Sequence, residues 1–226
     1  MAKRKCFLAQ PDQIPVYREE LFEFAFFNGF ALVQKQKSIF SFHQAIRKAY
    51  PEKHILEIST KSPDPLGVSL SAFNLKLACP GLPYNYHLEN VFQASKVFKE
   101  GGPYRDILSL LPREAKRDER TKTSGPLLHF DFFGEIFPLE PKSLFYDWIY
   151  LKALAGHPEL AHEIIRYDAF TDIEFNHIKS FSCQARSAAI FVSLHRRDEL
   201  GIALENKDFL RKFYKEKNDT LICPLC

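Results

Sequence analysis

The chain has 226 residues, which fits one domain and is long enough to bury a hydrophobic core. Hydrophobic residues make up 46% and charged residues 26%, as in an ordinary globular protein, and no apolar stretch reaches the roughly 20 residues of a membrane span. The net charge of +3 permits contact with nucleic acid but is milder than that of a dedicated DNA-binding protein. Basic residues near the N-terminus precede no apolar stretch, so we expect a cytoplasmic protein without a signal peptide.

The five cysteines are scattered along the chain, which favours reduced thiols over a disulfide framework. Cys223 and Cys226 have the spacing of half a zinc site. No second cysteine or histidine pair with matching spacing lies nearby, so we expect a loose tail there and no bound metal.

The N-terminal segment predicts irregular structure followed by a β-hairpin. Residues 1–19 contain Pro11 and Pro15, and we expect an irregular lead-in. Asn28-Gly29 then separates apolar runs at 21–27 and 30–35, which is a strong hairpin signal.

A helix and a short strand follow this hairpin. Ser38 can cap a helix that runs to about Tyr50, where Pro51 stops it. Residues 54–60 alternate well enough for a strand.

A loop at residues 70–74 carries the first candidate binding residues. Phe73 is suited to stacking on a ring, and Ser71 and Asn74 to polar contacts. The alternative is an ordinary turn in which Asn74 bonds its own backbone.

An amphipathic helix is predicted over residues 88–98, and Gly101-Gly102 ends it. At about 100° per residue, Glu89, Gln93 and Lys96 fall in a narrow arc of one face. That face either is solvated surface or lines a pocket with an acid, an amide and an amine. The stretch itself leaves both interpretations open.

The remaining elements are predicted to be mainly helical. Residues 113–122 hold several cations that can bind phosphate, but interleaved carboxylates equally permit a solvated face. Helices are expected at about 104–111, 113–122, 141–154, 159–166, 184–195 and 207–215, with a short strand or apolar loop at 127–136. The economical prediction is one mainly α domain with a small β portion, namely the N-terminal hairpin and short strands.

Several segments, in one order, resemble the NADAR family, to which the YbiA proteins belong. Ser71-Ala72-Phe73-Asn74 is similar to the family's Ser-Asn-Phe-aromatic loop, and residues 88–96 are similar to its Val-Glu-His-Tyr-Phe-Gln-Ala-x-Lys helix. Residues 114–117 read Glu-Ala-Lys-Arg and residues 157–160 read His-Pro-Glu-Leu, close to two later family segments. Asp172 stands where the family has an acidic residue, although the family's following Trp-Gly is absent.

The resemblance covers roughly residues 68–180 and is strongest to the NADAR antitoxins that accompany DarT-type toxins. It implies a YbiA-like helical catalytic domain over 68–226, with residues 1–67 as an extension packed on it. In this branch the toxin attaches ADP-ribose to guanine in DNA. The resemblance therefore implies an antitoxin that removes it, a metal-independent ADP-ribosyl glycohydrolase without a cofactor. The implied partners are ADP-ribosylated DNA, free ADP-ribose and a cognate DarT-type toxin.

The resemblance also implies roles for individual residues. Glu89 would be the acid/base, assisted by Asp172, and Lys96 would either form a Schiff base with the sugar or stabilise charge while Glu89 activates water. The implied substrate-binding residues are Ser71, Phe73, Asn74, Phe92, Gln93, Lys116, Arg117 and Trp148.

Two other functions fit the same residues. One is a non-catalytic protein that binds ADP-ribose or neutralises a toxin by wrapping it. The other is an N-glycosidase acting on a small nucleotide of riboflavin metabolism, as some YbiA relatives are thought to be. Only a catalyst needs both Glu89 and Lys96.

Overall fold

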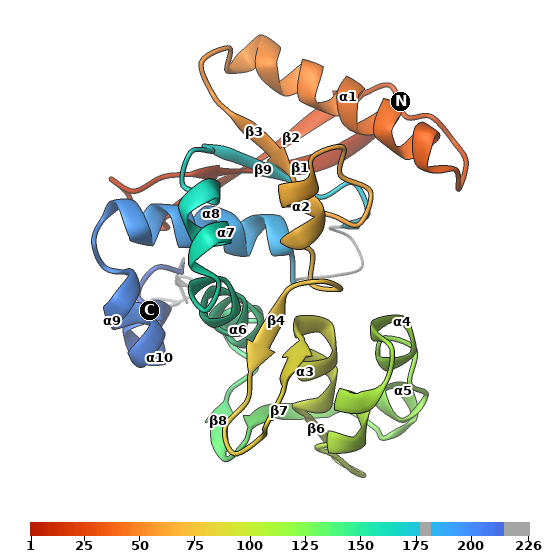
Figure 1. Cartoon of the computed structure of the whole chain (residues 1–226), viewed down its shortest axis with the longest axis vertical. Helices are drawn as coiled ribbons and strands as arrows, with labels where there is room; N and C mark the ends of the chain where they lie inside the picture. Colours follow the sequence, from red (N-terminus) through yellow and green to blue (C-terminus); the bar gives the residue numbers. More distant parts are fainter. Residues whose placement is uncertain (177–181, 215–226) are drawn as a thin grey trace, which may run out of the picture.

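A computed structural model describes residues 1–176 and 182–214 (Figure 1). Within these ranges the strands are β1 (Ala2–Ala9), β2 (Tyr17–Phe24), β3 (Ile55–Glu57), β4 (Lys76–Ala78), β5 (Asn85–His87), β6 (Lys96–Phe98), β7 (Leu127–Phe132), β8 (Glu135–Phe137) and β9 (Ala169–Thr171). The helices are α1 (Leu32–Ala49), α2 (Pro65–Ser69), α3 (Leu88–Ala94), the 3₁₀ helix η1 (Arg105–Ser109), α4 (Pro112–Ala115), α5 (Arg120–Thr123), α6 (Leu144–Ala155), α7 (Pro158–Ile164), α8 (Gln184–Arg196), α9 (Leu200–Glu205) and α10 (Lys207–Arg211).

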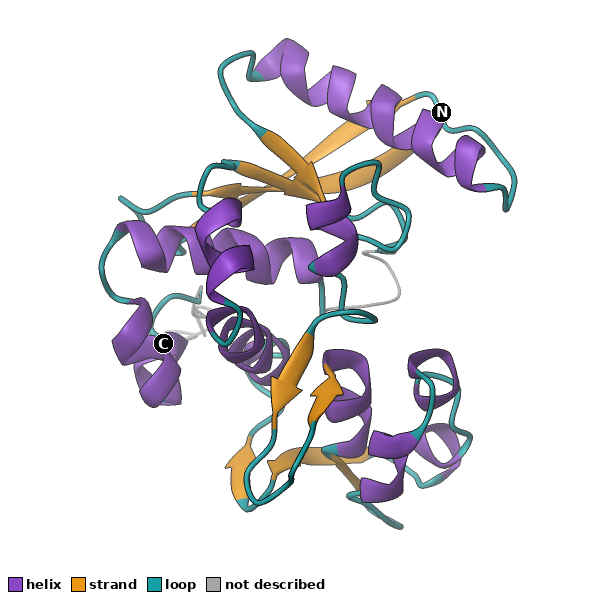
Figure 2. Cartoon of the chain, in the orientation of Figure 1, coloured by secondary structure: helices purple, strands orange, loops and turns teal. Residues whose placement is uncertain are grey.

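The largest sheet of the described chain has the strand order β2-β1-β9-β3 and lies between helices α1 and α8 (Figures 1 and 2). Strand β1 pairs antiparallel with both β2 and β9, and β9 pairs in parallel with β3. On one face, Ile39 and Phe42 of α1 pack with Leu8 of β1. On the other face, Phe7 and Phe170 join the core that contains α8. Both faces of the sheet are therefore covered.

The predicted mainly α fold is wrong, because the described chain is a mixed α/β structure with three sheets. The error begins at the N-terminus, where the predicted irregular lead-in is strand β1, paired with β2 across the loop that holds Pro11 and Pro15. Asn28-Gly29 is not a hairpin turn but part of the connection from β2 to α1. The hydrophobic residues of β1 are buried by partners distant in sequence, which local patterns do not reveal.

The second half of the core surrounds α6, which packs on α8 and α3. Strands β4 and β5 form a two-stranded sheet, and β6, β7 and β8 form a three-stranded sheet. Figure 1 shows these small sheets with α3, α4 and α5 on the far side of the molecule from the large sheet. The predicted helices over 141–154 and 184–195 are confirmed as α6 and α8, and the predicted strand at 54–60 as β3.

The predicted division into residues 1–67 and 68–226 stays a prediction. The large sheet combines β1, β2 and β3 from the first segment with β9 from the second. The two segments therefore share one layer of backbone hydrogen bonds and its hydrophobic core.

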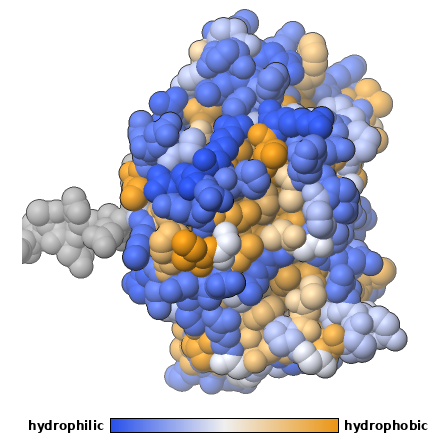
Figure 3. Space-filling model, turned by 60° about the vertical axis from the view of Figure 1, so that its left-hand side comes forward, coloured by the Kyte–Doolittle hydropathy of each residue, from blue (hydrophilic) through white to orange (hydrophobic). Residues whose placement is uncertain are grey.

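The surface is unevenly apolar. On the face in Figure 3, hydrophobic residues gather in a band between largely hydrophilic regions. In the described part of the chain, no helix combines the length and hydrophobicity needed to cross a membrane.

Candidate functional site

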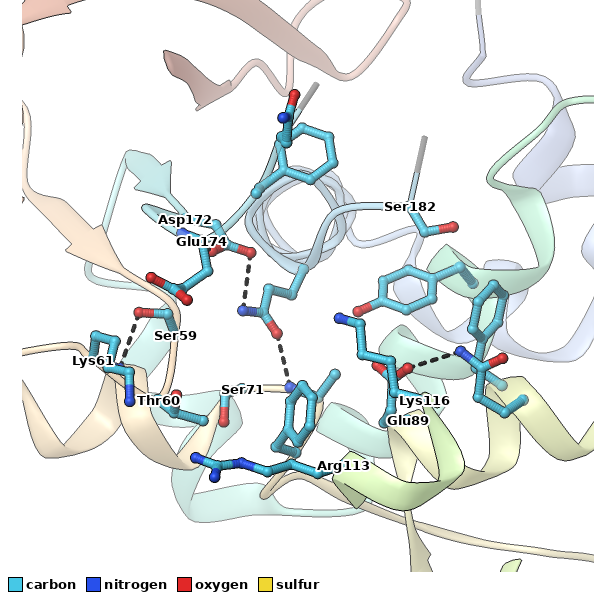
Figure 4. Close-up of a pocket in the computed structure, with 18 of the residues that line it drawn as sticks. Ser59, Thr60, Lys61, Ser71, Glu89, Arg113, Lys116, Asp172, Glu174 and Ser182 are labelled. Atoms are coloured by element: carbon cyan, nitrogen blue, oxygen red, sulfur yellow. Dashed lines mark hydrogen bonds between the residues drawn. The ribbon is translucent and has the colours of Figure 1, made fainter. Parts of the chain in front are cut away.

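A cavity of about 740 Å³ lies between the large sheet and α3, and Figure 4 shows part of its lining. The segments that follow β3, α2 and β9 contribute to its wall, as do α3, α4, Tyr146 of α6 and Gln184 of α8. The lining residues are Phe30, Ser59, Thr60, Lys61, Ser71, Ala72, Phe73, Glu89, Phe92, Gln93, Lys96, Arg113, Lys116, Arg117, Tyr146, Asp172, Glu174, Phe175, Asn176, Ser182 and Gln184.

Glu89, Gln93 and Lys96 form a continuous hydrogen-bonded chain in this cavity. The Gln93 side-chain amide donates to Glu89 Oε1 at 2.8 Å, and Lys96 Nζ donates to Gln93 Oε1 at 2.7 Å. Glu89 and Gln93 are buried, and the backbone of Glu89 is anchored to Ala72 O at 3.0 Å. An acid and an amine are thus linked through one amide.

The predicted helix over residues 88–98 is too long, which changes how Lys96 reaches the cavity. Helix α3 ends at Ala94, and Lys96 begins strand β6, where it pairs with Phe130 of β7. Its side chain extends over the Phe92 ring, with Nζ 4.8 Å from the ring centroid. The amine is therefore held by a strand and a ring, not by a second helical turn.

The surroundings of Lys96 favour its neutral form more than water does. The pKa of its amine falls from 10.5 to about 8, mainly because the amine is buried; Glu89 raises this pKa and Lys116 lowers it. Roughly a tenth of the amine is therefore unprotonated at pH 7, and about half at pH 8. Such an amine can act as a nucleophile.

Asp172 lies on the side of the cavity opposite Glu89 and Lys116 in the view of Figure 4. Burial, reinforced by the nearby carboxyl of Glu57, raises its pKa from 3.8 to about 8. Its two oxygens accept from the Glu174 backbone and from the Gln184 side chain, each at 3.0 Å. At neutral pH this carboxyl is largely protonated and able to donate a proton.

Gln184 fixes one wall of the cavity and was not predicted as a site residue. Its amide nitrogen donates to Ile58 O at 2.6 Å as well as to Asp172, and its oxygen accepts from Ala72 N at 2.8 Å. It thereby connects the segments after β3, β9 and α2. No pattern in the sequence indicates this role, because only the tertiary structure brings these segments together.

Aromatic rings form a flat apolar wall. Phe92 stacks on Phe130 with ring centroids 5.4 Å apart and meets Tyr146 edge-on at 5.1 Å. Phe73 lies beneath Lys116, whose Nζ is 5.3 Å from the ring centroid. This wall suits a planar ring system.

Cations line the side formed by α4. The predicted helix over 113–122 is in fact two short helices, α4 and α5. Only α4 and the two residues that follow it bring cations to the cavity. Arg113, Lys116 and Arg117 line it, whereas Arg120 pairs with Asp118 and Asp106. Within residues 1–176 and 182–214, no carboxylate forms an ion pair with the three lining cations.

Two predicted site residues lie elsewhere. Trp148 is 2% exposed and packs on Phe132 and Phe137, because its face of α6 points toward β7 and β8. The Asn74 side chain donates to Val68 O of α2 at 2.9 Å, not to its own backbone as in the alternative interpretation, and does not line the cavity. The other predicted residues, Ser71, Phe73, Glu89, Phe92, Gln93, Lys96, Lys116, Arg117 and Asp172, all line it.

Sequence reasoning missed the part of the site near the large sheet. Ser59, Thr60 and Lys61 follow β3, and Glu174 and Phe175 follow β9. The only feature of the sequence that could have indicated them is that they directly follow strands, of which β3 was predicted and β9 was not. Because β3 and β9 are parallel neighbours, the segments after them meet at one edge of the sheet.

Among the described residues, no three histidine, cysteine, aspartate or glutamate side chains lie close enough together to hold a metal ion. Cys223 and Cys226 lie outside the described residues.

The comparison with known families matches nearly the whole chain. The model of a family described as DarT1-associated NADAR antitoxin matches residues 2–221. No curated protein sequence matches the chain. The family match includes the N-terminal strands as well as the segments that line the cavity. The chain therefore belongs to the family of DarT1-associated NADAR antitoxins.

Proposed function

We propose that this protein is a glycohydrolase that removes ADP-ribose from guanine bases of DNA and thereby counteracts a DarT-type toxin. Its family already indicates an antitoxin role against DarT. The observation that carries the proposed chemistry is the buried chain Glu89–Gln93–Lys96, in which a carboxylate and an amine of lowered pKa meet in one cavity.

The cavity has the size and lining that ADP-ribose requires. Its volume of about 740 Å³ lies in the range typical of pockets for drug-sized ligands. Phe73 and Phe92 offer flat surfaces for a ring, and Arg113, Lys116 and Arg117 offer charge for a diphosphate. Ser71 and the neutral carboxyl of Asp172 are suited to ribose hydroxyls.

In the first possible mechanism Lys96 forms a covalent intermediate. Opening of the ribose ring converts the N-glycoside into an imine between C1′ and the guanine nitrogen. Neutral Lys96 Nζ adds to C1′, and the bond from C1′ to the guanine nitrogen breaks as that nitrogen takes a proton from Glu89. Water then hydrolyses the Lys96 imine, which releases ADP-ribose and restores the amine.

In the second mechanism the sugar ring stays closed and no covalent intermediate forms. Glu89 takes a proton from water, the resulting hydroxide attacks C1′, and guanine leaves as its nitrogen is protonated by Asp172. Lys96, protonated here, stabilises negative charge on the substrate. Both mechanisms consume one water and yield ADP-ribose and an unmodified guanine that remains in the DNA.

The test is release of ADP-ribose from guanine-modified DNA by the unaltered protein and by Glu89→Gln. This substitution keeps the side-chain shape and removes the ionisable group. We expect release to fall roughly 10²–10⁴-fold, the usual contribution of a positioned acid/base. Glu163→Gln, on the exposed surface of α7, is the matched control and should match the unaltered protein.

The same assay separates the competing functions. No release by the unaltered protein together with tight binding of ADP-ribose would favour a non-catalytic binding protein. Release of the base from a free nucleotide of riboflavin metabolism, without release from DNA, would favour the small-molecule N-glycosidase.

A further inference from the structure

A buried carboxyl beside the segment that carries Asp172 has no part in either mechanism. Glu57 belongs to β3 and is 1% exposed. In the part of the chain that the structure describes, no cation forms an ion pair with it. A buried carboxylate without a cation is costly, so its surroundings must stabilise it in another way.

Glu57 holds the chain on both sides of Asp172. Its Oε2 accepts from Thr171 Oγ1 at 2.6 Å, and its Oε1 accepts from the backbone nitrogen of Ile173 at 2.8 Å. Glu57 and Thr171 are also register partners in the parallel pair of β3 and β9. The backbone is therefore fixed before and after Asp172, and with it the place where this carboxyl enters the cavity.

A second buried side chain continues the hydrogen bonds from Thr171 into α1. His43 Nε2 lies 2.8 Å from Thr171 Oγ1. Burial, reinforced by the charge of Arg47, lowers the pKa of His43 to about 3, so the ring is neutral. The Thr171 hydroxyl has one proton and gives it to Glu57, so the hydroxyl oxygen accepts a proton from His43 Nε2. Both side-chain donors are therefore directed toward Glu57.

The hydrogen-bond lengths favour a negative charge on Glu57 and a proton on Asp172. The oxygens of Glu57 accept at 2.6 and 2.8 Å, as is typical of an ionised acceptor, whereas both hydrogen bonds to Asp172 measure 3.0 Å. Burial raises the pKa of Glu57 and, together with the nearby Glu57, raises that of Asp172 to about 8. Two neighbouring buried carboxyls do not both ionise near neutral pH, so the pair keeps one proton.

Other titratable groups face Asp172 from the elements packed around it. They are Glu174 after β9, Lys116 after α4, Tyr146 and Tyr150 of α6, and Cys183 before α8. Burial raises the pKa of both tyrosines and of the cysteine, so these three stay neutral near pH 7. Glu174 is 44% exposed and paired with Lys35, and the charge of Lys116 acts on Asp172 less strongly than that of Glu57. Among these described groups, Glu57 therefore supplies the buried negative charge beside Asp172.

We propose that Glu57, supported by Thr171 and His43, is the positioning residue that holds Asp172 in place and keeps it protonated. The inference rests on the proposed function and adds to it, because the cavity then presents Asp172 to the substrate as a neutral acid in both mechanisms. An ionised Asp172 could neither protonate guanine nor donate to a ribose hydroxyl, and it would repel the diphosphate. Glu57 itself gives up no proton and stays charged throughout the reaction.

The first test is the titration of the Asp172 carboxyl, followed by NMR in protein isotopically labelled at aspartate and without substrate. Asp172→Asn identifies the resonance. The midpoint should lie near pH 8 in the unaltered protein. In Glu57→Gln it should be at least about one pH unit lower, because the buried charge is gone. Glutamine has the same shape and can keep both hydrogen bonds, since Thr171 can donate to His43 once the ring changes its tautomer.

Two further variants support this titration. Glu174→Gln is the matched control, because it removes the other carboxylate near Asp172 and keeps the backbone donor, so the midpoint should move by less than about 0.3 pH unit. Thr171→Val keeps the side-chain shape and removes one donor to Glu57. Part of the shared proton should then move to Glu57, and the Asp172 midpoint should fall. This variant tests the inference even if Glu57→Gln does not fold.

The second test is kcat/KM for release of ADP-ribose from guanine-modified DNA. The ratio of Glu57→Gln to the unaltered protein at one pH cancels the titration of Lys96. We expect a loss of about fivefold at pH 8, where Asp172 of the variant is mostly ionised, and almost none at pH 6. An equal loss at both pH values would mean that Glu57 only supports the fold.

The titration keeps this inference separate from the proposed catalysis. A lower midpoint in Glu57→Gln without any release by the unaltered protein would remove the proposed function and retain the role of Glu57 toward Asp172. An unchanged midpoint in Glu57→Gln, or an equal shift in Glu174→Gln, would overturn the inference. So would a midpoint below about pH 5 in the unaltered protein, because Asp172 would then be ionised at neutral pH.

Discussion

At the scale of single residues, the amine of Lys96 donates a hydrogen bond to Gln93 and lies over the ring of Phe92. The sequence alone could place Glu89, Gln93 and Lys96 near one another, because helical spacing and family resemblance both bring them together. It could not give the hydrogen bonds through Gln93, the ring of Phe92 beneath the amine, or the lowered pKa. Those depend on burial by distant segments.

Lys96→Arg separates the two mechanisms, because arginine keeps a positive charge but cannot form the imine. With a covalent intermediate, we expect release of ADP-ribose to fall at least about 100-fold. Borohydride added during turnover should then attach ADP-ribose to Lys96 in the unaltered protein, as detected by mass spectrometry. Residual activity within about tenfold of normal, without such an adduct, would exclude the covalent mechanism.

The pH dependence of kcat/KM independently distinguishes the covalent from the non-covalent mechanism, because it reports the ionisations of the free enzyme. Lys96 has a pKa of about 8. If the neutral amine attacks, kcat/KM should rise through pH 8. If the protonated amine stabilises charge and Asp172 supplies the proton, kcat/KM should fall above pH 8 as both groups lose a proton. In Lys96→Arg the contribution of Lys96 to this fall should be absent and that of Asp172 should remain.

Asp172→Asn should change how stability depends on pH. The pKa of Asp172 rises from 3.8, its value in an unfolded chain, to about 8 in the fold. The folded state therefore holds a proton that the unfolded chain releases. This contribution to stability is complete below about pH 4 and is lost as pH rises to about 8.

Because asparagine stays neutral, the variant should lose less stability than the unaltered protein between pH 5 and pH 8.5. Thermal unfolding at the two pH values measures the difference. Parallel changes in Tm would show that Asp172 does not hold a proton in the folded state.

At the scale of elements, the sequence predicted the buried helices better than the sheets. Helix α6 was anticipated because Pro141 and Gly156 indicate its two ends, and α8 because residues 184–195 have the pattern of a buried helix. Strand β1 was missed because Pro11 and Pro15 indicated irregular structure, whereas both lie in the loop between β1 and β2. Its other partner, β9, lies more than 160 residues away. Helix α3 was overextended because Lys96 fits the helical arc, although its backbone pairs with β7.

Gly102→Ala should disturb the strand that carries Lys96. A Cβ at Gly102 would lie 2.4 Å from the backbone oxygen of Lys96, and the φ of Gly102 is +90°. We expect a loss of about 2–4 kcal/mol in stability, from the positive φ and the forced backbone shift, together with reduced activity. A thermal unfolding scan and the ADP-ribose release assay measure the two effects.

Gly134→Ala is the matched control for this prediction. Gly134 has a φ of +96°, but its Cβ would meet no atom within 4 Å. It should therefore lose only the roughly 1–2 kcal/mol that a positive φ costs and keep full activity. Equal losses in the two variants would mean that the contact with Lys96 is unimportant.

At the scale of the whole molecule, the N-terminal segment is part of the structure that forms the site. Strand β9 lies between β1 and β3, and the segments after β3 and β9 supply Ser59, Lys61 and Asp172 to the cavity. The resemblance in sequence began near residue 68 and gave no indication of this dependence. Only the pairing of strands far apart along the chain reveals it.

A chain that begins at residue 68 should therefore not fold. It would leave Ala169, Phe170 and Thr171, all fully buried in the complete protein, without either neighbouring strand. Circular dichroism and size-exclusion chromatography of this truncated chain test the expectation. A compact, cooperatively unfolding product would support an independent domain over 68–226.

The position of β9 also has a consequence for synthesis on the ribosome. The sheet needs residues 169–171 between strands made much earlier, so β3 cannot join the β1–β2 pair until most of the chain has emerged. Contacts so distant in sequence form slowly, and unpaired strand edges invite association with other chains in the meantime. An antitoxin built in this way can complete the large sheet, and the cavity beside it, only after residues 169–171 have left the ribosome.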